Sequence, residues 1–291
     1  MLISVATAVD YASDCMLRSG SGVSALDNDV QILLSRSLHR LAHAQDEMHL
    51  NCGDEQQRFE IDKMVVLLTL RCLIGVGDDS LAFESLKNNG LCNALQRIHL
   101  KELSTSAKQN EGDIQSLKNF TLMADLAEER KMHQTSRCLH CLCAQLMYQT
   151  GNFVLDIGDY ETSLGEIQKR TIQMATSAKD VLDVYAEIDK IVEKHQHVGK
   201  DRKYGSFYSM HDLNWFAKDA NNRAVEHDLL RDYETAAKLF ATALNILPLC
   251  DREMQQYAQA MNAAYQQVTS KMTTYGHSLG SIWNLLQNES H

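Results

Sequence analysis

Three cysteines and one histidine stand close together at positions 138–143, in the order Cys138-Leu139-His140-Cys141-Leu142-Cys143. Structural zinc takes four thiolate or imidazole ligands, supplied by two pairs separated along the chain. No second pair follows this run, and its helical pattern places Cys138 and Cys141 on one face and Cys143 on another. We interpret these cysteines as buried structural residues. A metal-binding protein or enzyme that uses the 138–143 cluster is the alternative.

A second metal-like spacing joins His39 and His43, which are four residues apart, as in the zinc-protease motif H-E-x-x-H. Arg40 stands where that motif requires its catalytic glutamate. We therefore interpret the two histidines as surface residues or as a hydrogen-bonded pair within the fold.

Phosphate-binding glycine loops of the G-x-x-x-x-G-K-[ST] and G-x-G-x-x-G types do not occur in the sequence. Carboxylates are abundant, but acid–base catalysis needs two of them in a shaped pocket, and no pair is singled out. We predict no catalytic residue, no cofactor and no metal. The chain is expected not to be an enzyme.

The composition predicts an all-α fold. Only one proline occurs in 291 residues, where average usage of about 5% would give about 15. Because proline removes a backbone donor and clashes with the preceding turn, a chain almost free of it can be helical nearly throughout. Neither alternating βαβ units nor evenly spaced valine-rich strands occur.

The net charge of the chain indicates which classes of partner it can bind. A net charge of −10 disfavours direct binding to nucleic acid, which needs a basic surface. The one basic cluster, residues 200–203, reads as a solvated loop. No apolar run reaches the roughly 18–20 residues that span a bilayer, so no membrane partner is expected. The eight cysteines indicate reduced thiols of an intracellular protein.

Residues 213–250 predict two helices joined by a tight turn at Leu230-Arg231-Asp232, in the pattern of a tetratricopeptide repeat. Small residues let the two helix backbones approach, aromatic residues fill the gap beside them, and proline ends the second helix. The positions that carry this pattern are Ala224, Tyr233, Ala236, Phe240, Ala243 and Pro248. The first helix matches less well, with Ala220, Arg223 and His227 at three motif positions. A chance helical hairpin is the alternative.

The same turn chemistry occurs twice more, at Gly75–Asp79 and at Gly158-Asp159-Tyr160, in a chain whose pattern is helical elsewhere. Two helices are expected before residue 51, and others over 55–74, 80–89, 91–104, 114–128 and 131–150. We predict a helical-hairpin solenoid (an α–α superhelix) with degenerate repeats, forming one domain over 1–291. The chain is expected to be a fragment of a longer solenoid, with flexible loops at 104–113 and 198–209.

Residues 160–197 predict one long helix with apolar residues at alternating spacings of three and four, the period of a coiled-coil seam. The seam residues are Leu164, Ile167, Thr171, Met174, Ala178, Val181, Tyr185, Ile188 and Val192. We favour a helix that packs against its neighbours in the solenoid. Dimerisation through this seam, or docking of a partner helix, is the alternative.

A solenoid of helical hairpins offers a concave surface lined by its first helices. Lys218, Asn221, Val225 and Asp228 lie beside the buried face of the first helix at spacings of three, four and three. We predict that these four residues line a groove for a partner. An ordinary solvated helix face is the alternative.

The two-helix segment resembles a meiosis-specific tetratricopeptide family that promotes crossovers. This family comprises the sporulation and synapsis-initiation scaffold of fungi, its testis-expressed counterpart in animals and its plant equivalent. The likeness lies in Asn222-Arg223-Ala224-Val225-Glu226, followed by an Asp-Tyr-x-x-Ala run at 232–236. It covers residues 213–247.

The resemblance implies a non-enzymatic scaffold in the nucleus, associated with chromosomes, that joins recombination proteins to assembly of the synaptonemal complex. Its partners would be other proteins. The alternative is a general tetratricopeptide adaptor for chaperones, transport or signalling, in the cytoplasm. A carboxylate-clamp adaptor would need a second asparagine where Val225 stands, which argues against that type.

Overall fold

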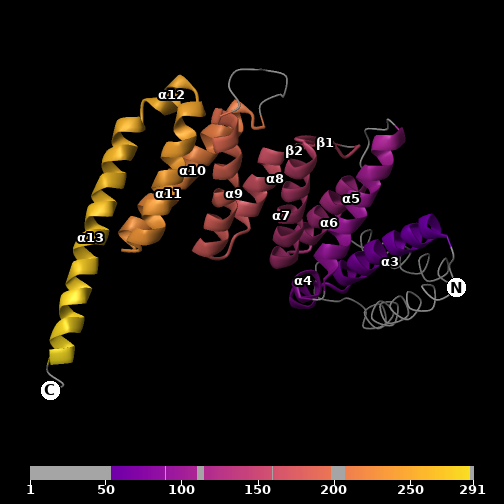
Figure 1. Ribbon diagram of the computed structural model, residues 1–291, viewed down its shortest axis with the longest axis horizontal. Helices are drawn as coiled ribbons and strands as arrows, with labels where there is room; N and C mark the ends of the chain where they lie inside the picture. Colours follow the sequence, from indigo (N-terminus) through magenta and orange to yellow (C-terminus); the bar gives the residue numbers. More distant parts are fainter. Residues whose placement is uncertain (1–53, 89, 110–114, 159, 198–206, 289–291) are drawn as a thin grey trace. The chain divides into compact units, whose positions relative to one another are not determined.

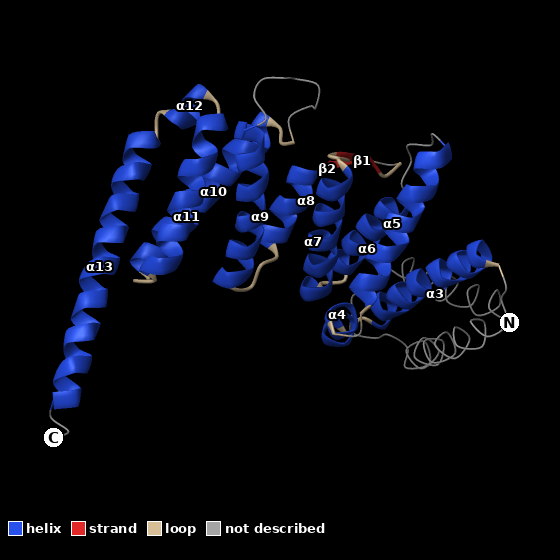
Figure 2. Cartoon of the chain, viewed as in Figure 1, coloured by secondary structure: helices blue, strands red, loops and turns tan. Residues whose placement is uncertain are grey.

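The computed structural model describes residues 54–88, 90–109, 115–158, 160–197 and 207–288 (Figure 1). Within these ranges 83% of the residues are helical, in eleven α-helices, beside one two-stranded sheet (Figure 2). The all-α class is therefore confirmed. The two helices expected before residue 51, with His39 and His43, lie outside the described residues.

The chain divides into two compact units, Met1–Thr162 and Ser163–His291. The sequence predicts one continuous domain over 1–291 instead. Each unit has its own helices and its own buried apolar residues. No helix among the described residues is both long and apolar enough to cross a membrane.

The helices of the first unit begin and end close to the predicted positions: α3 (Glu55–Val76), α4 (Asp79–Lys87), α5 (Leu91–Gln109), α6 (Gln115–Glu129) and α7 (His133–Thr150). Gly77 ends α3 in the left-handed region, with φ 77°, and Asp78 caps α4 by accepting a hydrogen bond from the Leu81 N–H. Ala82 and Leu86 of α4 are fully buried.

The prediction of a flexible loop at 104–113 is wrong for residues 104–109, because α5 continues to Gln109. Polar residues such as Ser104 and Lys108 have adequate helix propensity when they lie on an exposed helix, so polarity alone did not mark the end of α5. Residues 110–114 lie outside the described part of the chain.

Side chains cap helices across the first unit. The Asp79 carboxylate accepts hydrogen bonds from the Gln134 N–H at 3.0 Å and the Thr135 N–H at 2.9 Å, at the start of α7. At the other end, the Arg130 guanidinium donates to the carbonyls of Ile74 and Gly75 in the last turn of α3. Both contacts satisfy backbone groups that a helix leaves without intrahelical partners.

The third helical hairpin, predicted around Gly158-Asp159-Tyr160, is instead a β-hairpin of β1 (Val154–Asp156) and β2 (Glu161–Ser163). Gly158 has φ 106°, a conformation that favours glycine, and its N–H donates to the Asp156 carboxylate. A Gly-Asp turn can join two strands as well as two helices, so the turn residues alone do not distinguish a β-hairpin from a helical hairpin.

The long helix predicted over 160–197 is also wrong, because the chain breaks it into α8 (Leu164–Gln173) and α9 (Ala178–His197). Ser163 caps α8, and the Ser177 hydroxyl accepts a hydrogen bond from the Asp180 N–H at the start of α9. Most residues of the expected seam are buried within this single chain: Leu164, Ile167, Thr171, Val181, Tyr185, Ile188 and Val192. Met174 is buried as well, and these residues form part of the core of the second unit.

The predicted two-helix segment is present as α10 (Met210–Leu229) and α11 (Tyr233–Ile246). The turn between them holds Arg231 at φ 62°. The small and aromatic residues Ala224, Ala236, Phe240 and Ala243 are buried, and Tyr233 is half-buried. Pro248 follows α11 within the short 3-10 helix η1 (Leu247–Leu249). Of the loop predicted at 198–209, residues 207–209 are described and lead into α10.

The second unit ends with α12 (Arg252–Gln255) and the long α13 (Ala258–Asn288). Helix α11 lies between neighbours, packing against α9, α10 and α13. A polar contact joins α11 to α9, where the Thr242 hydroxyl and the Asn245 amide donate to the Asp189 carboxylate at 2.6 and 2.9 Å. Because α10 and α13 both pack on α11, they form the two walls of a groove.

Candidate functional site

A groove of about 730 Å³ lies in the second unit between α10 on one side and α12 with the start of α13 on the other. This volume falls within the range of about 300–1,000 Å³ that is typical of ligand-binding clefts. Its walls carry His211, Asn214, Trp215, Lys218, Asn221, Asn222 and Val225 from α10, and Asp251, Glu253, Met254, Tyr257, Ala260, Met261 and Ala264 from the other side.

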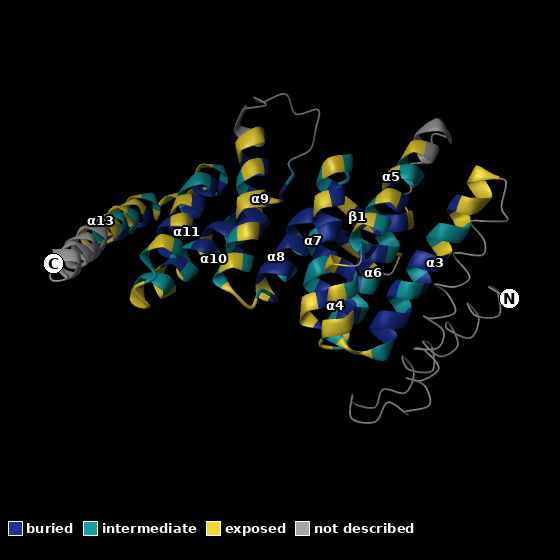
Figure 3. Ribbon diagram, turned by 60° about the horizontal axis from the view of Figure 1, so that its bottom comes forward, coloured by how far each residue is buried: buried dark blue, intermediate teal, exposed yellow. Residues whose placement is uncertain are grey.

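The residues of α10 that line the groove lie on one face of the helix, and the ribbon of Figure 3 shows how burial varies along α10 and its neighbours. Its lining residues recur at intervals of three and four, so they share a side of the helix. The residues on another side, including Ala217, Ala220 and Ala224, are fully buried. A capping box fixes the start of the helix, because the Ser209 hydroxyl accepts from the Asp212 N–H and the Asp212 carboxylate accepts from the Ser209 N–H.

The opposite wall is attached to α10 through Asn214 and Asp251. The Asn214 amide donates to the Asp251 carboxylate, and the Asp251 N–H donates back to the Asn214 side-chain oxygen at 3.2 Å. Hydrogen bonds from the Met254 N–H and the Asn214 amide hold the pKa of Asp251 below its ordinary value. The Asp251 carboxylate, which lies on the wall opposite α10, is therefore negatively charged at neutral pH.

Three of the four residues predicted to face a partner line this groove: Lys218, Asn221 and Val225. Asp228 does not line it. Its carboxylate forms an ion pair with the Lys271 ammonium of α13, at 2.7 and 2.8 Å, and so joins the two walls further along α10. The role of the other three in binding stays a prediction.

The groove presents polar groups that are available to a ligand. Among the described residues, the Lys218 ammonium has no ion-pair partner, and the side-chain amides of Asn221 and Asn222 have no hydrogen-bond partner. Each amide carries both donors and an acceptor, which matches the N–H and C=O groups of a peptide backbone. Val225 and Tyr257 add apolar surface, with 44% and 54% of their area exposed.

Sequence reasoning missed the wall formed by α12 and α13. Tyr257 and Met261 belong to a segment in which the sequence shows only apolar residues at helical spacing. Their place in the same groove as Val225 depends on how α13 packs on α11. The spacing of residues within one helix does not reveal such packing. Trp215 carries no motif in the sequence, and in the structure it lines the groove with Lys218.

The 138–143 cluster is dispersed by its helix. Cys143 is buried and accepts a hydrogen bond from the Thr121 hydroxyl, and burial raises the pKa of its thiol to about 12. Cys138 instead faces Cys92 of α5, with 3.7 Å between the sulfur atoms. The hydrogen bond between these thiols lowers the pKa of Cys138 and raises that of Cys92. In the described part of the chain, these cysteines form no group of three metal ligands.

The Cys92–Cys138 contact makes a chemical prediction. Treating the folded protein with diamide should join the two residues: each thiol loses a proton and an electron, a disulfide forms, and diamide is reduced to its hydrazine. The sulfur atoms must approach from 3.7 Å to about 2.05 Å, a small side-chain movement. Peptide mass spectrometry should find a 92–138 linkage that Cys138→Ser abolishes and Cys250→Ser retains. Preferential linkage of Cys138 to Cys141 would contradict this geometry.

The sequence also contains one Gly-x-Ser-x-Gly run, Gly276-His277-Ser278-Leu279-Gly280, the spacing of a hydrolase nucleophile elbow. That elbow requires a strand, a sharp turn that carries the serine, and then a helix. Here the run lies within α13, so its backbone is helical on both sides of the serine. The motif therefore lacks the structural context of a nucleophile elbow.

Comparisons with known proteins add no relative to this description. A scan against protein-family models, a search of curated proteins and a search of solved structures each found no match.

Proposed function

We propose that this chain is a non-enzymatic scaffold that binds short segments of other proteins in the groove between α10 and α13. The observation that carries the proposal is the combination of available peptide-matching amides, at Asn221 and Asn222, with exposed apolar surface at Val225 and Tyr257. Catalytic sites instead bring a nucleophile, a base and an orienting group together. The described lining residues of this groove include no such set.

The groove favours a segment of particular chemistry. The Lys218 ammonium suits a carboxylate on the ligand, since the Asp251 carboxylate of the same groove is already bonded to Asn214, whereas Val225, Tyr257 and Met254 suit an apolar side chain. We therefore propose that the bound segment carries an acidic residue about one helical turn or a few extended residues from an aliphatic or aromatic anchor. Such anchors usually dominate the affinity of an interface.

The fold supports a finer proposal, that the second unit is built of degenerate tetratricopeptide-like repeats. The α10–α11 hairpin has small residues at its interface, and α13 follows as a further long helix that packs on α11. First helices of such repeats line the concave face of a solenoid, which is where α10 and α13 would then belong.

The identity of the partners is proposed from the resemblance of residues 213–247 to the meiotic crossover scaffolds. On that basis they are recombination and synaptonemal complex proteins, and the chain acts on chromosomes in the nucleus. Transcript abundance tests this part: strong restriction to meiotic cells supports it, and equal abundance in vegetative cells leaves a general tetratricopeptide adaptor.

Selection of a peptide library on the immobilised full chain tests the groove itself. Peptides recovered should carry an acidic residue and an apolar anchor, and Val225→Arg should weaken their binding at least tenfold, measured by fluorescence anisotropy. A buried interface position that loses its apolar contact and gains an unpaired charge usually costs more than about 1.4 kcal/mol.

Leu229→Arg is the matched control, since Leu229 lies one turn further on α10, is 77% exposed and does not line the groove. Equal affinities of the wild-type and Val225→Arg proteins would place the bound peptide elsewhere. An equal loss with Leu229→Arg would show a non-specific effect of charge.

A further inference from the structure

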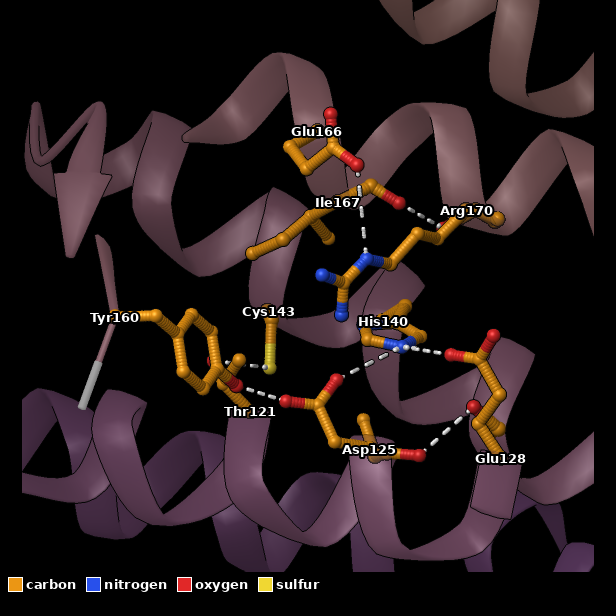
Figure 4. A network of polar contacts seen from close by, with 12 residues as sticks. Thr121, Asp125, Glu128, His140, Cys143, Tyr160, Glu166, Ile167 and Arg170 are labelled. Atoms are coloured by element: carbon orange, nitrogen blue, oxygen red, sulfur yellow. Dashed lines mark hydrogen bonds and ion pairs between the residues drawn. The ribbon is translucent and has the colours of Figure 1, made fainter. Parts of the chain in front are cut away.

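Helices α6 and α7 of the first unit bring one histidine of the 138–143 run together with two carboxylates that the sequence does not associate with it (Figure 4). His140 lies on α7, and Asp125 and Glu128 lie three residues apart on α6. The His140 Nε2 atom is 3.8 Å from an Asp125 oxygen and 3.7 Å from a Glu128 oxygen. One ligand atom from each residue lies within 4.8 Å of the others.

From this arrangement we infer that Asp125, Glu128 and His140 form a binding site for a divalent transition-metal ion of the zinc type. Imidazole and carboxylate together form a donor set that suits Zn²⁺, whereas purely carboxylate sites suit Mg²⁺ or Ca²⁺. Three protein ligands leave a further coordination position for water or for a group of a ligand.

The distances fit a metal better than they fit direct hydrogen bonds. Nitrogen–oxygen hydrogen bonds span about 2.7–3.2 Å, so 3.7 and 3.8 Å are too long for the His140 ring to bond either carboxylate directly. Two ligand atoms held about 2.1 Å from zinc at a tetrahedral angle lie about 3.4 Å apart. Closing the site therefore requires the two distances to His140 to shorten by a few tenths of an ångström, and a rotation of the half-exposed Glu128 carboxylate to bring its oxygen closer to that of Asp125.

Burial and charge support the same conclusion. The His140 side chain is fully buried, while 19% of the Asp125 side chain and 42% of the Glu128 side chain remain exposed. The histidine is thus fixed by the core, and an ion can enter from the carboxylate side. Two like charges one turn apart on α6 repel each other, and a bound cation would relieve that repulsion.

The Tyr160 hydroxyl supplies an outer contact of the kind that metal sites use. It donates a hydrogen bond to the second oxygen of Asp125, which orients that carboxylate toward His140 (Figure 4). Outer hydrogen bonds of this type typically change metal affinity by about 10–100-fold. Tyr160 lies in the β-hairpin, so the hairpin that replaces the expected helical turn acquires a role in positioning a ligand.

Isothermal titration of the chelator-treated full chain with zinc chloride tests the site. We expect one zinc ion per chain, loss of that binding in Asp125→Asn and in Glu128→Gln, and about tenfold weaker binding in Tyr160→Phe. Glu129→Gln is the matched control, because Glu129 is the exposed neighbour on the same helix and lies outside the cluster. These variants alter partly exposed positions, so their folding can be verified by circular dichroism.

Cobalt substitution separates this site from the cysteines. A histidine–carboxylate site gives a cobalt spectrum without the near-ultraviolet charge-transfer band of thiolate ligands, and Cys141→Ser should leave zinc affinity unchanged. Absence of zinc binding would overturn the inference. Zinc binding that survives Asp125→Asn and Glu128→Gln but is lost on Cys141→Ser would overturn it as well.

Discussion

Asp212→Ala should lower the free energy of unfolding of the second unit by about 3–5 kcal/mol, because it leaves the buried Lys169 ammonium with only the half-exposed Glu166 carboxylate, 3.7 Å away, as a counter-charge. The Lys169 ammonium lies 2.6 Å from the Asp212 carboxylate, and the two side chains are only 7% and 6% exposed. The same carboxylate accepts hydrogen bonds from the Ser209 N–H and hydroxyl, so the substitution also removes one half of the capping box of α10 and leaves the Ser209 cap itself in place.

The measurement is urea unfolding followed by tryptophan fluorescence. Both tryptophans of the chain, Trp215 and Trp283, belong to the second unit, so the signal reports that unit alone. Glu234→Ala is the control, since its ion pair with Lys238 is exposed and should be worth less than about 1 kcal/mol. A loss for Asp212→Ala no larger than for the control would contradict a buried ion pair.

A rescue separates the charge from the cap. In Asp212→Asn combined with Lys169→Met, no charge is buried and the asparagine oxygen can still accept from the Ser209 N–H in the capping box, so much of the lost stability should return. The stabilisation by Asp212 should also depend on pH. Burial alone would raise the pKa of Asp212, but the hydrogen bonds from Lys169 and Ser209 outweigh it and leave the pKa below its ordinary value.

A depressed carboxyl pKa fixes the sign of that dependence. The stabilisation by Asp212 should be fully present above its unfolded pKa of about 3.9 and lost as the pH falls through the lower folded value. The double variant should lose this part of the acid sensitivity. An unchanged acid transition in the double variant would show that other carboxylates dominate it.

Phe216→Ala is the second substitution with a large expected effect, about 3–5 kcal/mol. Phe216 is fully buried, and its ring meets those of Tyr208, Trp215 and Tyr185 edge-on, with centroids 5.3, 5.6 and 6.5 Å away. Removing it leaves a cavity beneath α10 and withdraws the support of Trp215, which lines the groove. Both stability and peptide affinity should therefore fall.

The same urea titration measures this loss, with Leu229→Ala as the control. Leu229 is 77% exposed on the same helix, so its truncation should change stability by less than about 0.5 kcal/mol. Equal stabilities of Phe216→Ala and Leu229→Ala would contradict the burial of Phe216.

The sequence was informative where structure depends on neighbouring residues. The α10–α11 hairpin follows from local signals: small residues such as Ala224 and Ala236 at the helix interface, and Pro248 after the second helix. Helix ends such as Gly77 and Asp78 were recognisable for the same reason, because a left-handed glycine and a capping aspartate act within one turn.

The sequence was uninformative where the structure depends on contacts between residues far apart in the chain. The apolar period continues through residues 174–177, so the break between α8 and α9 carries no periodic signal. Gly165 is another example: a Cβ atom there would lie 2.5 Å from the Asp212 carboxyl carbon, so α8 needs a glycine at the point where α10 begins. Only the packed structure shows that requirement.

The candidate sites follow the same division. Helical spacing placed Lys218, Asn221 and Val225 on one face, but only packing of α13 supplies the opposite wall. Asp125 and Glu128 share a face of α6, yet His140 joins them from α7 through the pairing of two helices. Neither arrangement has a sequence motif of its own.

Site-specific photocrosslinking in cells tests the central claim most directly. A photoreactive phenylalanine analogue at Val225, within the groove, should capture partner proteins on irradiation, and Lys218→Glu in the same chain should abolish the adducts. The analogue at Lys238, which is exposed on α11 and outside the groove, should give none of them. Identical adducts from both positions, or adducts at Val225 that persist with Lys218→Glu, would contradict a partner-binding groove between α10 and α13.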